Sequence, residues 1–185
     1  FALERLGRPD EAARHYQAMI ELDPGSAWAH GALGRYHAER GRIREAIVHF
    51  SQALKLEPDY PKARSQLGSA LYLAGRKSEG ISELRRVLMK DPDDAASLNA
   101  LAWILASDSD PSIRNPAEAV RLAERACELT GRKSAALLDT LAAAYHANGD
   151  NGMAVRTAKE ALDAAKKGGE KKLVDEITER LDEYH

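Results

Sequence analysis

The chain has 185 residues and a nearly balanced charge, with 27 Lys and Arg against 29 Asp and Glu and a net charge of −2. This balance gives no electrostatic reason to expect nucleic acid as a partner. Charged residues make up 30% of the chain and apolar residues 44%, which is typical of a globular protein and excludes a disordered one.

The sequence also gives little support for a disulfide framework, a zinc finger or a membrane span. The one cysteine, Cys127, has no second cysteine to pair with, and no Cys and His residues have zinc-finger spacing. No window approaches the roughly 18 uninterrupted apolar residues of a transmembrane helix. We therefore expect a soluble domain with a cytoplasmic location favoured, while attachment to a membrane-bound parent stays open. Because the chain opens at Phe1 within a repeating pattern, we expect it to be a fragment of a longer protein.

The first predicted helix runs over residues 9–22, and a 34-residue period continues from there. Five columns of similar residues share this step: Gly7, Gly41 and Gly75; Pro24, Pro58 and Pro92; Leu33, Leu67 and Leu101; Ala12, Ala46 and Gly80; Tyr16, Phe50 and Leu84. Five columns with one period are typical of a helical repeat protein.

Each column has a physical role in a pair of antiparallel helices. The glycine column ends a helix in the left-handed conformation, and the next helix begins almost at once. Small residues such as Gly68 and Gly80 lie on the facing helices, and we expect them to let the two backbones approach closely. The residue before each proline leaves the helical region and closes the repeat.

The pattern resembles the tetratricopeptide repeat family. The consensus columns of the second repeat are His30, Leu33, Gly34, His37, Ala46, Phe50 and Pro58, and those of the third are Arg64, Leu67, Gly68, Leu71, Gly80, Leu84 and Pro92. The opening tryptophan column of the family is missing. The resemblance implies an all-α fold, an α-α superhelix built as a solenoid of antiparallel helix pairs.

The predicted organisation is a single array over residues 1–185. It comprises a partial repeat at 1–26, repeats at 27–60, 61–94, 95–134 and 135–168, and a capping helix at 169–185. The apolar stripe of Leu173, Val174, Ile177 and Leu181 has helical spacing, as a helix that covers the end of a core requires.

The fourth repeat is longer than the others, since the step from Leu101 to Leu141 is 40 residues. The additional residues fall at 107–114, and a new helix is signalled after them by Asn115, Pro116 and Glu118. Two interpretations are open: a tolerated surface insertion, or a loop that contributes to binding.

No catalytic or metal-binding constellation is evident. Asp108 and Asp110 open no EF-hand, because the required glycine and twelfth-position carboxylate are absent. His30 and His37 lie two helical turns apart in repeat columns, so we expect them to pack rather than to chelate. We expect Cys127 to be a buried, unreactive thiol. The hypothesis is a protein that is not an enzyme and has neither cofactor nor metal.

A partner is expected on the concave face, which the first helix of each pair lines. The candidate contact residues on that face are Trp28, Arg35, Lys62, Gln66, Tyr72, Asn99 and Trp103. Relatives with a two-carboxylate clamp carry Lys and Asn at matched positions. Here Gly31, Ala96 and Ala100 stand there, so that function is not transferred.

The leading hypothesis is therefore a protein–protein interaction scaffold that binds a peptide or partner protein on this face. One alternative is a self-association module that forms a homo-oligomer. Another is an auxiliary substrate-positioning domain of a larger enzyme such as a glycosyltransferase. The enzyme alternative follows from the block from Leu101 to Tyr145, which is similar to C-terminal repeats in bacterial tetratricopeptide proteins. Some of those proteins carry an upstream enzymatic or membrane module, including glycosyltransferase-like ones.

Overall fold

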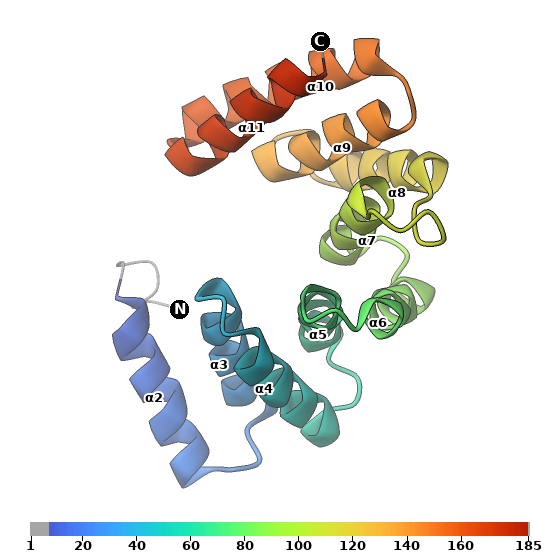
Figure 1. Ribbon diagram of the computed structural model, residues 1–185. Coiled ribbons are helices and arrows are strands. Elements are labelled where there is room, and N and C mark those ends of the chain that lie inside the picture. Colours follow the sequence, from blue (N-terminus) through green and yellow to red (C-terminus); the bar gives the residue numbers. More distant parts are fainter. Residues whose placement is uncertain (1–7, 185) are drawn as a thin grey trace. The chain divides into compact units, whose positions relative to one another are not determined.

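The computed structural model describes residues 8–184, and these residues form α-helices joined by short links, with no strand among them (Figure 1). The helices are α2 (Pro9–Leu22), α3 (Ala27–Glu39), α4 (Ile43–Leu56), α5 (Pro61–Leu73), α6 (Lys77–Lys90), α7 (Ala95–Ser107), α8 (Pro116–Leu129), α9 (Ala135–Ala147), α10 (Asn151–Gly168) and α11 (Lys171–Glu183). The first predicted helix, 9–22, is confirmed as α2.

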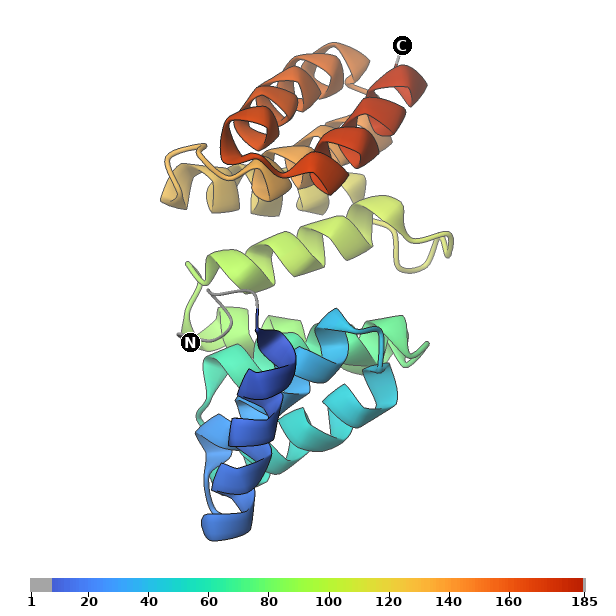
Figure 2. The ribbon, with the colours of Figure 1, turned by 90° about the vertical axis from the view of Figure 1, so that its left-hand side faces the viewer.

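The chain divides into two compact units, Phe1–Val87 (unit 1) and Leu88–His185 (unit 2). In unit 1, α3 packs against α2, α4 and α5. In unit 2, α7 packs against α8 and α9, and α10 packs against α9 and α11. Figures 1 and 2 show the paired helices running antiparallel within each unit, so the all-α architecture of helix pairs is confirmed.

Side-chain caps explain where several helices begin. The Ser26 hydroxyl accepts a hydrogen bond from the backbone N–H of Ala29 at 3.3 Å, and the Asp94 carboxylate accepts one from Ser97 at 2.7 Å. The predicted cap of α8 is also confirmed, since Asn115 accepts from the backbone N–H of Glu118 at 3.2 Å. Each cap satisfies a backbone donor that the first turn of a helix leaves unpaired.

The predicted glycine stops are confirmed at two positions. Gly41 has φ +70° and Gly75 has φ +83°, the left-handed conformation that residues with a Cβ rarely adopt. Gly7, the first member of the column, lies outside the described residues. The short links force α3 against α4 and α5 against α6.

Helices α5 and α6 approach each other closely at the glycine pair that the sequence singles out. A Cβ placed on Gly80 would lie 2.5 Å from the Gly68 carbonyl oxygen and 2.8 Å from the backbone nitrogen of Tyr72. A Cβ on Gly68 would lie 2.9 Å from the Gly80 carbonyl oxygen. Because backbone atoms occupy both spaces, only glycine fits at these two sites.

The insertion in the fourth repeat folds into a compact loop. Asp108, at its start, is only 3% exposed, and its carboxylate accepts a hydrogen bond from the backbone N–H of Asp110 at 2.7 Å. At the other end the backbone N–H of Asn115 donates to the Leu105 carbonyl at 3.0 Å. The second hydrogen bond holds the end of the loop against the last turn of α7. Arg114, the residue before Asn115, is therefore held beside α7 as well.

The region predicted to form a capping helix contains α11, whose Ile177 side chain is fully buried. Arg180 on α11 donates two hydrogen bonds, of 3.0 and 2.5 Å, to the buried carboxylate of Asp139 on α9. Tyr184 stacks on His146 of α9 with ring centroids 4.7 Å apart. The cap is therefore joined to α9 by an ion pair and by an aromatic contact.

We predict that Gly80→Ala destabilises unit 1 by about 1–2 kcal/mol. Alanine gains about 1 kcal/mol of helix propensity, but we expect the overpacking to cost about 2–3 kcal/mol, the upper part of the usual range, because the added Cβ meets two backbone atoms. Urea unfolding followed by circular dichroism measures the difference. Gly152→Ala is the matched control, because its Cβ would meet only the Asp150 carboxylate, at 3.7 Å. A Gly80→Ala protein as stable as the parent would contradict the close approach.

We predict that Arg180→Leu destabilises unit 2 by about 2–4 kcal/mol, because it leaves the buried Asp139 carboxylate without its ionic partner. This loss is smaller than the about 3–5 kcal/mol of a fully buried pair, since the Arg180 side chain is partly exposed. Burial already raises the pKa of Asp139, and the Arg180 charge opposes that rise. The double variant Asp139→Leu/Arg180→Leu should recover most of the loss. A double-mutant cycle of unfolding free energies checks this, and simple additivity of the two single losses would refute the coupling.

Candidate functional site

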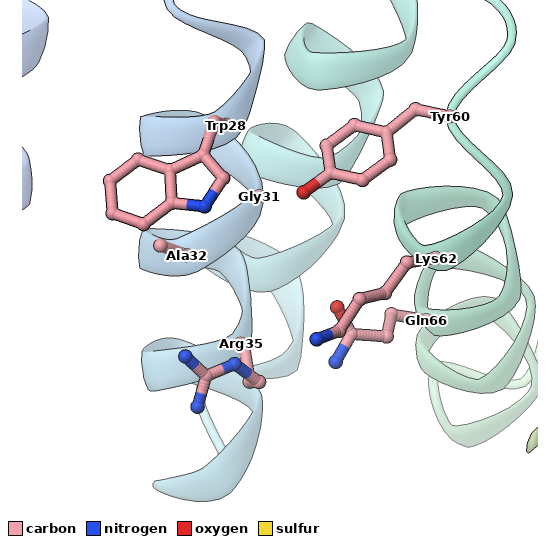
Figure 3. A pocket seen from close by; sticks show the side chains of 7 residues that line it. All are labelled: Trp28, Gly31, Ala32, Arg35, Tyr60, Lys62 and Gln66. Carbon is pink, nitrogen blue, oxygen red and sulfur yellow. The ribbon is translucent and has the colours of Figure 1, made fainter. Parts of the chain in front are cut away.

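Unit 1 contains a small pocket between α3 and the start of α5 (Figure 3). The residues that line it are Trp28, Gly31, Ala32, Arg35, Tyr60, Lys62 and Gln66. The space open to a water-sized group is about 20 Å³. A volume of that size holds about one water molecule, so the pocket fits one small chemical group of a larger partner.

Helix α3 supplies one wall, because four of its lining residues share a face. Trp28, Gly31, Ala32 and Arg35 follow the spacing i, i+3, i+4 and i+7. The indole of Trp28 is 38% exposed and meets the Tyr16 ring edge to face, at 5.4 Å between centroids and 87° between planes. The contact with Tyr16 holds the indole in place at the mouth of the pocket.

Tyr60 forms the opposite wall from its position just before α5. Its backbone is non-helical (φ −118°, ψ 84°), as expected of a residue before the proline at the first helical position. A Cβ on Gly31 would lie 3.3 Å from Tyr60 Cε1, so the absence of a side chain there makes room for the ring. Burial, with the nearby charge of Glu57, raises the pKa of Tyr60, while the Arg35 charge opposes that rise. The phenol is therefore a neutral hydrogen-bond donor at physiological pH.

The side chains in the pocket wall that carry a full charge are both cations, Arg35 and Lys62. Figure 3 shows Tyr60, Lys62 and Gln66 extending from the α5 side toward α3. Arg35 donates to Glu39 at 3.3 Å across one helical turn, with 24% of the Arg35 side chain and 55% of the Glu39 side chain exposed. Cationic, amide and phenol donors thus surround a space beside an indole.

The structure brings together four of the residues predicted to bind a partner. Trp28, Arg35, Lys62 and Gln66 all line the pocket in unit 1. Tyr72 lies further along α5 and does not line it; instead the Lys77 ammonium lies 5.8 Å from the centre of its ring.

The two other predicted contact residues belong to unit 2. Asn99 is partly buried on α7 and lines neither this pocket nor the one around Trp103. Trp103 lines a separate pocket of unit 2. The predicted contact residues therefore fall into more than one site.

The predicted contact residues do not include Tyr60, because all of them lie inside predicted helices, whereas Tyr60 precedes α5. The signal was present in the Tyr60–Pro61 pair at a helix start, opposite a glycine on the preceding first helix. Gly31 is a concave-face residue that departs from the family's clamp, and the structure shows that it also makes room for the Tyr60 ring.

Three histidines of unit 1 form a packed cluster, as predicted for His30 and His37, with His49 of α4 as an unforeseen third member. His30 Nδ1 and His49 Nδ1 lie 3.1 Å apart, and the His37 and His49 rings are parallel to within 5°. Burial lowers the pKa of His30 and of His37. Burial and the charges of its two neighbours lower the pKa of His49 to about 4. The cluster is neutral at physiological pH.

Two further predictions concern chemistry away from the pocket. Cys127 is fully buried as predicted, and burial raises the pKa of its thiol to about 11, so the nucleophilic thiolate is scarce at neutral pH. Between residues 8 and 184, no group of three or more His, Cys, Asp or Glu side chains is arranged to hold a metal ion. None of the helices in that range is long and apolar enough to cross a membrane.

A family model of the tetratricopeptide repeat matches residues 3–47 and 37–104, which together take in more than half of the chain. The chain belongs to the tetratricopeptide repeat family. Its helix pairs are thus tetratricopeptide repeats, and the family resemblance predicted from the sequence is confirmed. Proteins of this family are interaction scaffolds built from stacked helix pairs.

Solved structures with the same fold include three tetratricopeptide proteins. TTC0263 of Thermus thermophilus is 19% identical over 99% of this chain and 93% of its own, with a TM-score of 0.76. MamA of Desulfovibrio magneticus is 20% identical over 90% of each chain, with a TM-score of 0.66. YrrB is 17% identical over 96% of this chain and 87% of its own, with a TM-score of 0.62. At these identities the likeness establishes the solenoid fold alone. No curated protein matches the sequence.

We predict that acidification destabilises unit 1 through the histidine cluster. The folded-state pKa values of these histidines lie below the 6.5 of an unfolded chain, so the unfolded state binds more protons as the pH falls. Stability should therefore decline from about pH 6.5 to about pH 4 and then level off with respect to these groups. Urea midpoints across that range measure it. His49→Gln should give a shallower decline, and an unchanged slope would count against the cluster as the cause.

Proposed function

We propose that this tetratricopeptide protein is an interaction scaffold whose unit 1 pocket receives an acidic side chain from an extended peptide segment of a partner protein. The observation that carries this proposal is the composition of the pocket wall. Its two charged members, Arg35 and Lys62, are cations, and they lie beside hydrogen-bond donors and an exposed indole.

The size of the pocket favours a peptide over a small molecule. Pockets for cofactors and drug-sized ligands have volumes of about 300–1,000 Å³, whereas the space here is about 20 Å³. One carboxylate enters such a space, while the rest of its chain lies outside on the face formed by α3 and α5. Most of the binding free energy then comes from contacts along that face.

The existing ion pair of Arg35 does not oppose this role. A surface pair across one helical turn contributes only about 0.3–0.5 kcal/mol, so a partner carboxylate exchanges readily with Glu39. The fork geometry of the guanidinium suits a bidentate carboxylate contact. The phenol of Tyr60 and the amide of Gln66 add donors with fixed directions, and Trp28 adds the kind of aromatic area that anchors interfaces.

Two further points support a peptide partner. Tetratricopeptide arrays use the surface lined by their first helices for binding, and α3 and α5 are the first helices of their pairs. YrrB, one of the proteins with this fold, is described as having an unusual peptide-binding site. The expectation of a binding protein without catalytic activity is part of the proposal.

We predict that a peptide library displayed on phage and selected on the 185-residue protein yields sequences rich in Asp and Glu. A selected peptide should bind at least about tenfold more weakly to Arg35→Gln/Lys62→Gln, a loss of about 1.4 kcal/mol. Its affinity should also fall with added salt, because exposed charges are screened. Fluorescence anisotropy of the labelled peptide measures both effects.

The matched control is Arg44→Gln/Lys55→Gln, which removes the same charge from two residues of α4 outside the pocket. It should keep the parent affinity. Equal losses in both double variants would show that total charge, not the pocket, governs binding. Selection of no acidic sequence would refute the proposed ligand, and a mass in light scattering that rises with concentration would instead favour self-association.

A further inference from the structure

Unit 2 contains a second, larger pocket on the side where α7, α9 and α11 meet. Its lining residues come from these helices and from the end of the inserted loop: Trp103, Ala106, Ser107, Arg114, Ala143, His146, Ala147, Arg180, Glu183 and Tyr184. The space open to a water-sized group is about 270 Å³. This volume lies just below the range of about 300–1,000 Å³ for small-molecule sites, so it suits one large side chain.

Aromatic rings form two walls of this pocket and are held by other contacts. The Arg180 guanidinium lies 5.5 Å from the centre of the Trp103 ring, and the bonds from Arg180 to the buried Asp139 fix it there. On the other wall, His146 and Tyr184 stack at 4.7 Å, and His146 Nδ1 lies 3.0 Å from the Asn151 amide oxygen. The walls are therefore preorganised, which lowers the entropic cost of binding.

Alanines leave the space between those walls open. Ala106 contributes from α7, and Ala143 and Ala147 contribute from successive turns of α9. A larger side chain at Ala143 would enter the pocket. The apolar surface of these alanines and of the rings favours a ligand group that is itself largely apolar.

The charges around the pocket nearly cancel. Arg180 is neutralised by Asp139, and the carboxylate of Glu183 balances the guanidinium of Arg114. Arg114 is exposed and makes no side-chain hydrogen bond or ion pair to any residue between 8 and 184. A guanidinium in that position complements the face of an aromatic ring through cation–π attraction. An anionic ligand would instead meet the Glu183 carboxylate.

We propose that this pocket binds one aromatic side chain, Phe, Tyr or Trp, of a partner peptide. The ring enters between Trp103 and the His146–Tyr184 stack, and Arg114 covers its exposed face. The inserted loop of the fourth repeat thus contributes to binding through its last residue, and the capping helix contributes Arg180 and Tyr184. This site shares no residue with the pocket of unit 1 and does not depend on it.

The test uses the full 185-residue chain labelled with ¹⁵N and titrated with N-acetyl-L-tyrosinamide. The chain has two indole N–H groups, of Trp28 and Trp103, and a Trp28→Phe variant assigns their NMR signals. The Trp103 signal should shift saturably, with a dissociation constant on the order of 1–10 mM for a single side chain. The Trp28 signal should not move.

Ala143→Leu should abolish the shift by filling the pocket. Ala136→Leu is the matched control, since Ala136 is an exposed residue two turns earlier on α9 that does not line the pocket. It should keep the parent response. Arg114→Gln should weaken binding by about two- to fivefold, the effect of one exposed cation–π contact. All three variants should keep the parent circular dichroism spectrum.

Three outcomes would overturn the proposal. The first is that the Trp103 indole signal shows no saturable shift, and the second is that Ala143→Leu shows the same shift as the parent. The third is that N-acetyl-L-leucinamide or N-acetyl-L-glutamate amide binds more tightly than the tyrosine derivative. Tighter binding of the glutamate derivative would identify an anion site. Since Arg35→Gln/Lys62→Gln leaves unit 2 intact, it should retain the full Trp103 response, so failure of one pocket is distinguishable from failure of the other.

Discussion

The close approach of paired helix backbones is the constraint on which the rest of the structure depends. At Gly68 and Gly80 the approach leaves no room for a Cβ, and at Gly34 a Cβ would lie 2.7 Å from the Phe50 ring. Buried alanines such as Ala46 allow similarly close packing elsewhere. Tight pairs bury a core from small side chains, so few large apolar residues are needed. Each first helix also has a face that does not pack against its partner helix. Side chains on that face are not required for the core and are available for binding.

Both pockets arise where that face meets an irregular element. In unit 1 the element is the link before α5, where the non-helical Tyr60 lies over Gly31. In unit 2 it is the inserted loop, which ends in Arg114, and the regular helix α11 adds Arg180 and Tyr184 to the same pocket. Regular helices supply fixed positions, and the irregular segments supply the side chains that enclose a space. This division follows from the physics of repeats, since packing dictates the helices and tolerates change between them.

The sequence predicted the fold closely because its evidence is local and repeated. A 34-residue column of glycines fixes helix ends, and Asn115, Pro116 and Glu118 fix a helix start, so α2 and the cap of α8 follow from short-range rules. The candidate site was predicted only in part. Trp28, Arg35, Lys62 and Gln66 share a pocket because helical spacing places them on facing helices. The contacts of His49 and Arg180 join residues 19 and 41 positions apart, and no local pattern reveals them. The place of Tyr60 depends on the conformation of the link before α5.

The two pockets differ in chemistry although the backbone that supports them repeats. In unit 1 two cations line a space for one small group, and the exposed Glu39 pairs with Arg35 across a helical turn. In unit 2 the Arg180 guanidinium is already neutralised by buried Asp139, which leaves rings and alanines to define the space. The same ion pair therefore has two consequences: it attaches the capping helix to α9, and it removes the net charge that would otherwise have selected an acidic ligand. A solenoid end cap needs one polar face toward water and one face toward the core. Here Arg180 both pairs with a buried carboxylate on the core-facing side and lines the neighbouring pocket, which is why we propose an aromatic rather than an acidic ligand there.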